Sequence, residues 1–181
     1  MKFLHVKPWN LTIGAPPKCG SSSIHAALQR EFGCANLVDC PEVNLVKRAL
    51  VTGDVVFIVR YPLRRFKSLW RNKCRDKGKL AGHDGKLYGL TPDVLFDYVV
   101  AHDNHHWTPQ AELLGDLKAT LVPLENLNEW WAHATPTKQR FGMLTWNATV
   151  GDVPMSDELK RNVLEYYADD LVLHALARDG A

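Results

Sequence analysis

Short apolar runs alternate with longer amphipathic segments along the chain. Three runs rich in Val, Ile and Leu predict β-strands, at residues 11–16, 55–59 and 119–124. Segments whose apolar residues recur three and four positions apart predict helices, at residues 22–32, 41–50, 62–75, 92–101, 126–134, 157–167 and 169–178. The polar segments 76–90 and 102–116 are expected to be irregular. This alternation favours an α/β fold with a central parallel sheet flanked by helices, and 181 residues suit a single domain over residues 1–181.

The segment that joins the first predicted strand to the first predicted helix has the composition of a phosphate-binding loop. Gly20 allows the backbone to approach an anion closely, and Lys18 adds a full positive charge. The serines that follow bring their hydroxyl groups beside the free N–H groups of the first helical turn. The residues expected to bind the anion are Pro17, Lys18, Cys19, Gly20, Ser21, Ser22 and Ser23.

This loop does not match the P-loop of nucleoside triphosphatases. That motif, G-x-x-x-x-G-K-[ST], places Lys after the last Gly, whereas Lys18 precedes Gly20 here. A magnesium-dependent enzyme of that kind also needs an acidic residue at the end of a neighbouring strand. The next strong strand is instead followed by Arg60, which repels a metal ion and attracts a phosphate. The sequence therefore predicts a phosphorylated donor bound without metal, and a small nucleotide or metabolite kinase is the alternative enzyme.

Several segments, in order along the chain, resemble the sulfotransferases that use 3′-phosphoadenosine 5′-phosphosulfate (PAPS). Residues 17–23, PKCGSSS, are similar to the family's 5′-phosphosulfate loop, and residues 60–68 are similar to its 3′-phosphate motif, R-x-P-x-x-R-x-x-S. Residues 106–110, HWTPQ, resemble a segment of the carbohydrate branch, and residues 122–127 resemble a late strand ending in E-x-L. The resemblance implies a P-loop-like sulfotransferase fold. It also implies transfer of a sulfuryl group to a hydroxyl of a glycan or other small acceptor, with adenosine 3′,5′-bisphosphate (PAP) as product and no metal.

The resemblance also implies roles for individual donor-binding residues. Lys18 would neutralise the charge that grows on the leaving phosphate oxygen, and Arg60 with Ser68 would bind the 3′-phosphate. Tyr61 stands where the family commonly has an acidic residue or Asn. Arg65 has two interpretations, a further anion contact or a partner for an acidic side chain.

The general base that takes the acceptor proton is open to several assignments. His106 is the first candidate, because imidazole suits proton transfer near neutral pH and a neighbouring aromatic could stack on a sugar. Asp39 and Glu42 are alternatives, because they lie between the two donor motifs. Four tryptophans are candidates for a sugar platform, with at least one of the adjacent pair expected in the core: Trp107, Trp130, Trp131 and Trp146.

Composition and charge narrow the range of partners. The formal net charge of +2 is too small to indicate nucleic-acid binding. The first ten residues lack an apolar signal region, and no stretch approaches the roughly 18 apolar residues of a membrane span, so a cytoplasmic protein without membrane contact is expected. The expected partner is a hydroxylated acceptor, and a non-catalytic nucleotide-binding module is the second class of function.

The cysteines favour free thiols over a metal site. There are four of them, and none forms a C-x-x-C pair, so no zinc site is expected. Cys19 has two interpretations. Helix-end amides and Lys18 could activate its thiol, or the residue could be a small filler of the loop.

Overall fold

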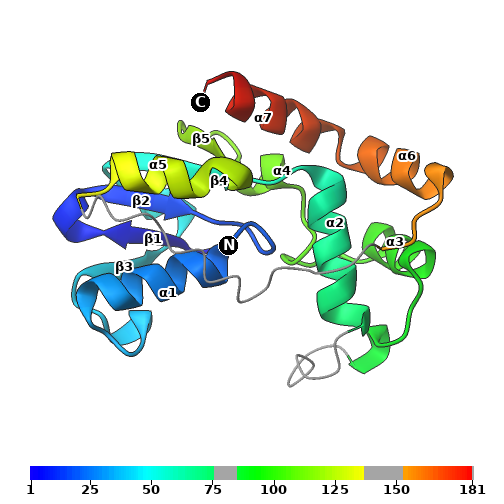
Figure 1. Cartoon of the computed structure of the whole chain (residues 1–181), viewed down its shortest axis with the longest axis horizontal. Helices are drawn as coiled ribbons and strands as arrows, with labels where there is room; N and C mark the ends of the chain where they lie inside the picture. The colour runs from blue at the N-terminus through cyan, green and yellow to red at the C-terminus, as the bar shows by residue number, and fades with distance from the viewer. Residues whose placement is uncertain (76–84, 137–152, 181) are drawn as a thin grey trace.

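A five-stranded mixed sheet lies at the centre of the computed structural model, which describes residues 1–75, 85–136 and 153–180 (Figure 1). The order of the strands is β3-β1-β2-β4-β5. Their bounds are Phe3–Val6 for β1, Leu11–Gly14 for β2, Val43–Val46 for β3, Asp54–Val59 for β4 and Thr120–Pro123 for β5. Strands β2, β4 and β5 are parallel, whereas β1 is antiparallel to both β2 and β3. The α/β class is confirmed, but the sheet is mixed rather than parallel.

Two strands on one side of the sheet account for this difference. A single 3-10 turn, Lys7–Trp9, followed by Asn10 in the left-handed conformation (φ 46°), connects β1 to β2 as a hairpin. Such a short connection can join only antiparallel neighbours. The helix expected over residues 41–50 is wrong, because this segment forms β3 and a 3-10 turn, Arg48–Leu50. Pairing with β1 overrides the helical spacing of its apolar residues.

The helices otherwise follow the predicted pattern closely. They are α1 (Ser21–Phe32), α2 (Pro62–Trp70), α3 (Pro92–Ala101), α4 (Gln110–Leu114), α5 (Leu127–Ala134), α6 (Asp157–Tyr166) and α7 (Ala168–Asp179). Thr91 and Ser156 cap α3 and α6 with their side-chain oxygens. A π-helical turn, Arg71–Arg75, continues α2 to the expected end. The prediction of an irregular segment over residues 102–116 is wrong in part, because this segment contains helix α4.

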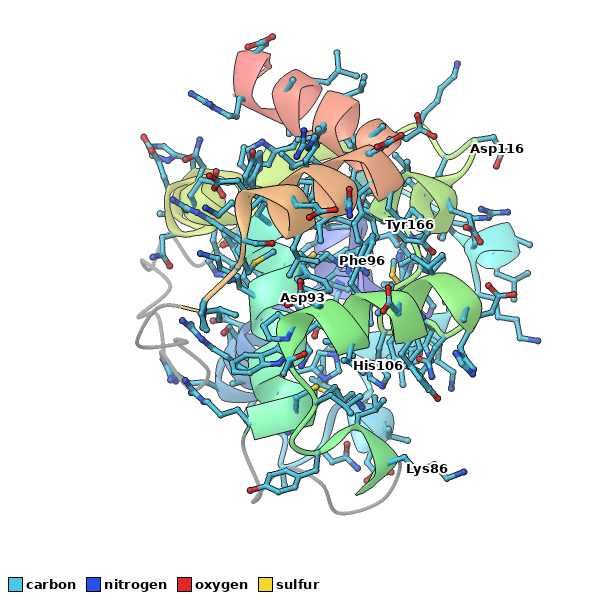
Figure 2. All side chains as sticks on the ribbon, turned by 90° about the vertical axis from the view of Figure 1, so that its right-hand side faces the viewer. Lys86, Asp93, Phe96, His106, Asp116 and Tyr166 are labelled. Carbon is cyan, nitrogen blue, oxygen red and sulfur yellow. The ribbon has the colours of Figure 1, made fainter. Side chains whose placement is uncertain are left out.

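Three groups of buried side chains hold these layers together. Alternate residues of β4 face opposite sides of the sheet: Ile58 packs with the core under α1 and α5, whereas Phe57 packs with Leu173 of α7. The third group lies between α2, α3 and α6, which gather at one end of the molecule beside the sheet. Figure 2 faces that end, where Phe96 and Tyr166 meet edge to face at 6.0 Å between ring centroids.

The parallel part of the sheet determines where a ligand could bind. The carboxyl ends of β2, β4 and β5 lie along one edge, since these strands run in the same direction. Open α/β sheets bind ligands outside this edge. Among the described residues, no helix is both long enough and apolar enough to traverse a bilayer.

Candidate functional site

The loop between β2 and α1 has an unusual backbone. Lys18 and Gly20 both have positive φ, at 70° and 80°, and the Cys19 N–H donates to the Pro16 carbonyl at 2.9 Å. A Cβ at Gly20 would lie 2.7 Å from Leu124 Cδ1, which would have to shift, and the positive φ strains any other residue there. Lys18 carries the left-handed conformation without being glycine, which is uncommon and concentrated at functional sites.

The start of α1 offers hydrogen-bond donors at the end of this loop. In the described part of the chain, no protein group accepts a hydrogen bond from the backbone N–H of Ser21 or Ser22. The helix behind them is twelve residues long, and its dipole adds partial positive charge at this end. Together with the loop, these groups can bind an anion.

Arg60 extends from the end of β4 to the same loop. Its Nη1 donates to the Lys18 carbonyl at 2.7 Å, and in the described ranges its Nε and Nη2 have no protein acceptor. Burial lowers the pKa of Arg60, and the negative charge of Glu125 opposes that effect. Arg60 therefore supports the loop with one nitrogen and retains two for a ligand.

Helix α2 and its π-helical continuation contact the loop through two side chains. Lys18 Nζ donates to Asn72 Oδ1, and Arg65 Nε donates to the Pro17 carbonyl at 3.3 Å. Ser68 is half-buried three residues after Arg65 and four before Asn72, so it lies on the flank between these two contacts. The fold thus brings the loop, Arg60 and the α2 flank that carries Ser68 to one edge of the sheet.

A fully buried side chain, Gln110 of α4, joins these parts. Its Oε1 accepts hydrogen bonds from the Arg60 N–H at 2.8 Å and the Cys19 thiol at 3.0 Å. Its Nε2 donates to the Arg60 carbonyl at 2.9 Å and to Asp170 Oδ2 at 3.0 Å. All four hydrogen-bonding positions of the amide are used. The sequence analysis assigned Gln110 no role, although it ends the HWTPQ segment.

Asp170 of α7 was not found from the sequence and is also fully buried. Its carboxylate accepts the Ala111 N–H at 2.9 Å and lies 3.6 Å from Arg65 Nη1. Arg65 also donates to the Thr108 carbonyl at 2.9 Å. Of the two interpretations of Arg65, pairing with an acidic residue is confirmed. The pair attaches the C-terminal helix to the loop.

Cys19 is a structural thiol. Burial raises its pKa to about 11, although Arg65 and Arg60 act to lower it. The thiol is therefore protonated near neutral pH and can donate to Gln110 Oε1. This favours the loop-filler interpretation of Cys19 over a reactive thiolate.

His106 lies between α3 and α4, beside α3 in Figure 2. Its backbone N–H donates to Asn104 Oδ1 at 3.0 Å, and its ring centroid is 4.2 Å from that of His105. Arg65 donates both to the carbonyl of Thr108, two residues later, and to the carbonyl of Pro17 in the loop. Arg65 therefore links this segment to the loop. The assignment of His106 as the general base stays a prediction.

The other candidates for acceptor contacts are less favoured. Since β3 is parallel to β2, Asp39 and Glu42, which precede β3, lie at the edge of the sheet opposite Lys18. That position disfavours both carboxylates as the base. Trp107 and Trp131 are buried core residues rather than parts of a sugar platform, and Trp130 is half-buried beside Trp131. Trp146 lies outside the described residues.

Within the described ranges, no three His, Cys, Asp or Glu side chains are grouped as a metal site. Searches of protein-family models, of curated proteins and of solved structures found no match to this chain.

Replacing Gln110 by Leu should lower the free energy of unfolding by about 3–5 kcal/mol. The substitution keeps the volume but removes hydrogen bonds from the Arg60 peptide and from one Asp170 oxygen, at about 1–3 kcal/mol for each buried group. Urea denaturation followed by circular dichroism measures the loss. Gln29→Leu is the matched control, since Gln29 is half-buried and makes one hydrogen bond, to the Ala35 carbonyl, so it should cost about 1 kcal/mol or less. Equal effects of the two substitutions would contradict the role of Gln110.

The raised pKa of Cys19 predicts a loss of stability in alkali. The thiol is neutral in both states below pH 9; above this the unfolded chain ionises first, so stability falls until the folded pKa of about 11. We expect wild type to lose about 2–3 kcal/mol more than Cys19→Ala between pH 9 and pH 11. Denaturation curves across this range measure the difference. A wild-type slope that matches Cys19→Ala would refute the assignment.

Proposed function

We propose that this protein is a PAPS-dependent sulfotransferase acting on a hydroxyl of a glycan or other small acceptor. The observation that carries the proposal is the meeting of two anion-binding elements at one edge of the sheet. One is the loop with Lys18 and the free N–H groups of Ser21 and Ser22. The other is Arg60 with two uncommitted guanidinium nitrogens, near the α2 flank of Ser68.

The two elements suit a donor that carries phosphate at two positions. The start of α1 would bind the 5′-phosphosulfate, because backbone N–H groups at a helix start favour negative charge. Arg60 and Ser68 would bind the 3′-phosphate, since a guanidinium offers forked, permanently charged donors. The loop carbonyl that Arg60 contacts belongs to Lys18, which would couple the two subsites.

Lys18 is proposed to act on the leaving group. As the acceptor oxygen bonds to sulfur, the bond from sulfur to the phosphate oxygen breaks and negative charge collects on that oxygen. Asn72 holds the Lys18 ammonium beside the loop, from which it could turn toward the developing charge. His106 remains the proposed base for the acceptor proton, on a segment joined to the loop through Thr108 and Arg65.

PAP should stabilise the protein without a metal ion. A ligand that binds only the folded state adds about 2.7 kcal/mol at a hundredfold excess over its Kd. Thermal unfolding with millimolar PAP, in the presence of a chelator, should raise Tm clearly, and ATP with Mg²⁺ should raise it less. A shift that needs Mg²⁺ would favour the kinase alternative. No shift of Tm with PAP would contradict the assignment of PAPS as the donor. Tight binding of PAP without turnover of any acceptor would favour the non-catalytic module.

Substitutions at the two subsites should separate binding from turnover. Arg60→Ala should weaken PAP binding by about 2–3 kcal/mol, because the 3′-phosphate contact exists before and during reaction. Lys18→Ala should mainly lower kcat, because its best contact forms as charge develops. Arg64→Ala, an exposed residue on α2, is the control of equal charge. The assignment fails if Arg60→Ala and Arg64→Ala bind PAP equally well in calorimetry.

A further inference from the structure

A carboxylate and an imidazole meet at the same edge of the sheet, outside the donor contacts described above. His174 Nε2 lies 3.1 Å from Glu125 Oε1, with side-chain exposures of 8% for His174 and 36% for Glu125. The His174 ring also packs edge to face on Tyr61, at 5.5 Å between centroids. The pair therefore has one partly exposed charge, held in place by a buried ring.

The pairing of β4 with β5 brings this pair near Arg60. Glu125 follows β5 and Arg60 follows β4, two paired parallel strands, and His174 links Glu125 to Tyr61, the residue after Arg60. The Gly20 backbone packs against Leu124, the neighbour of Glu125 in the chain. Glu125 also acts electrostatically on Arg60, opposing the fall in the Arg60 pKa that burial causes. Glu125 is thus a nearby negative charge for Arg60.

We propose that Glu125 and His174 set the charge that the Arg60 subsite presents, so that binding of a phosphate there is coupled to uptake of a proton by the pair. The inference rests on the proposed function, because it takes the ligand of Arg60 to be the 3′-phosphate of the nucleotide. Glu125 and His174 are positioning residues in this account.

The sign of the coupling follows from the charges. With neutral His174 the pair has a charge of −1, which repels the phosphate that Arg60 attracts. Protonation of His174 brings the pair to zero and removes the repulsion. A phosphate therefore favours the protonated pair, and by linkage the protonated pair favours the phosphate to the same degree. Affinity for an anion should therefore rise as the pH falls.

Other charged or titratable groups lie on the elements that carry this pair or adjoin it. They are the same residues in wild type and in the Glu125→Gln variant compared below. They are Arg60 and Tyr61 after β4, Arg64 and Arg65 on α2, Glu129 one turn beyond Glu125, and Asp170 and Arg178 on the turns of α7 before and after His174. Asp170 is already committed to Arg65 and Gln110, so it does not replace Glu125.

The test measures PAP binding by calorimetry from pH 5.5 to pH 8.5, using the full chain and buffers of different ionisation enthalpy. Glu125→Gln should bind PAP about five- to tenfold more tightly than wild type at pH 8, a coupling at the lower end of the usual range because Glu125 is partly exposed. The ratio should fall toward one as the pH is lowered, because a protonated His174 offsets the charge of Glu125 in wild type. Titration of the phosphate itself affects PAP binding to both proteins equally, so it cancels in the ratio of their Kd values.

Two variants complete the design. His174→Gln keeps a hydrogen-bond donor but cannot become charged, so it should match wild type at pH 8 and bind more weakly at pH 5.5. Glu129→Gln makes the same charge change one turn away and should match wild type throughout. Two results would overturn the inference. One is that Glu125→Gln binds PAP with the wild-type Kd at pH 8, and the other is that the ratio of the two Kd values does not change with pH.

The same design distinguishes failure of this inference from failure of the proposed function. If wild type does not bind PAP, the function is wrong, and the measurement is repeated with inorganic sulfate, whose charge is constant over this range. A pH-dependent Glu125→Gln effect on sulfate that Arg60→Ala abolishes would support the coupling alone. No binding of sulfate, or an effect independent of Arg60, would overturn it.

Discussion

The side chain of Gln110 is the constraint on which the arrangement of the site depends. Its amide pairs with both the N–H and the C=O of Arg60, in the manner of a neighbouring strand, and so fixes the peptide that carries the proposed phosphate contact. It also binds Cys19 of the loop and Asp170 of α7. A strand end, the anion loop and the C-terminal helix are therefore held by one buried group, and unpaired polar atoms there would be costly.

The two arginines beside this network, Arg60 and Arg65, differ in the groups that they contact. Arg65 serves protein partners, since it is paired with Asp170 and donates to the carbonyls of Pro17 and Thr108. Arg60 uses one nitrogen to support the loop, and among the described residues the other two have no protein acceptor. Two arginines separated by five positions along the chain thus have different roles, one maintaining the loop and one available to a ligand, with Glu125 as a nearby negative charge.

Local signals explain what the sequence predicted. The strand, loop and helix over residues 11–32 were predicted almost to the residue, because glycine, serines and apolar spacing determine them within a short stretch. Strand β3 was missed because its pairing with β1, about forty residues away, decides its conformation. Gln110 and Asp170 were missed for a similar reason: their partners lie at least fifty positions away, and neither type of side chain marks a buried network by itself.

A crystal structure of the protein grown with PAP and without divalent metal tests the central claim most directly. The account predicts the 5′-phosphate within hydrogen-bond distance of the Ser21 and Ser22 N–H groups, and the 3′-phosphate on Arg60 and Ser68, with Gln110 unmoved. A nucleotide bound elsewhere, or one whose 3′-phosphate is directed away from Arg60, would contradict the assignment of this edge as a phosphosulfate donor site.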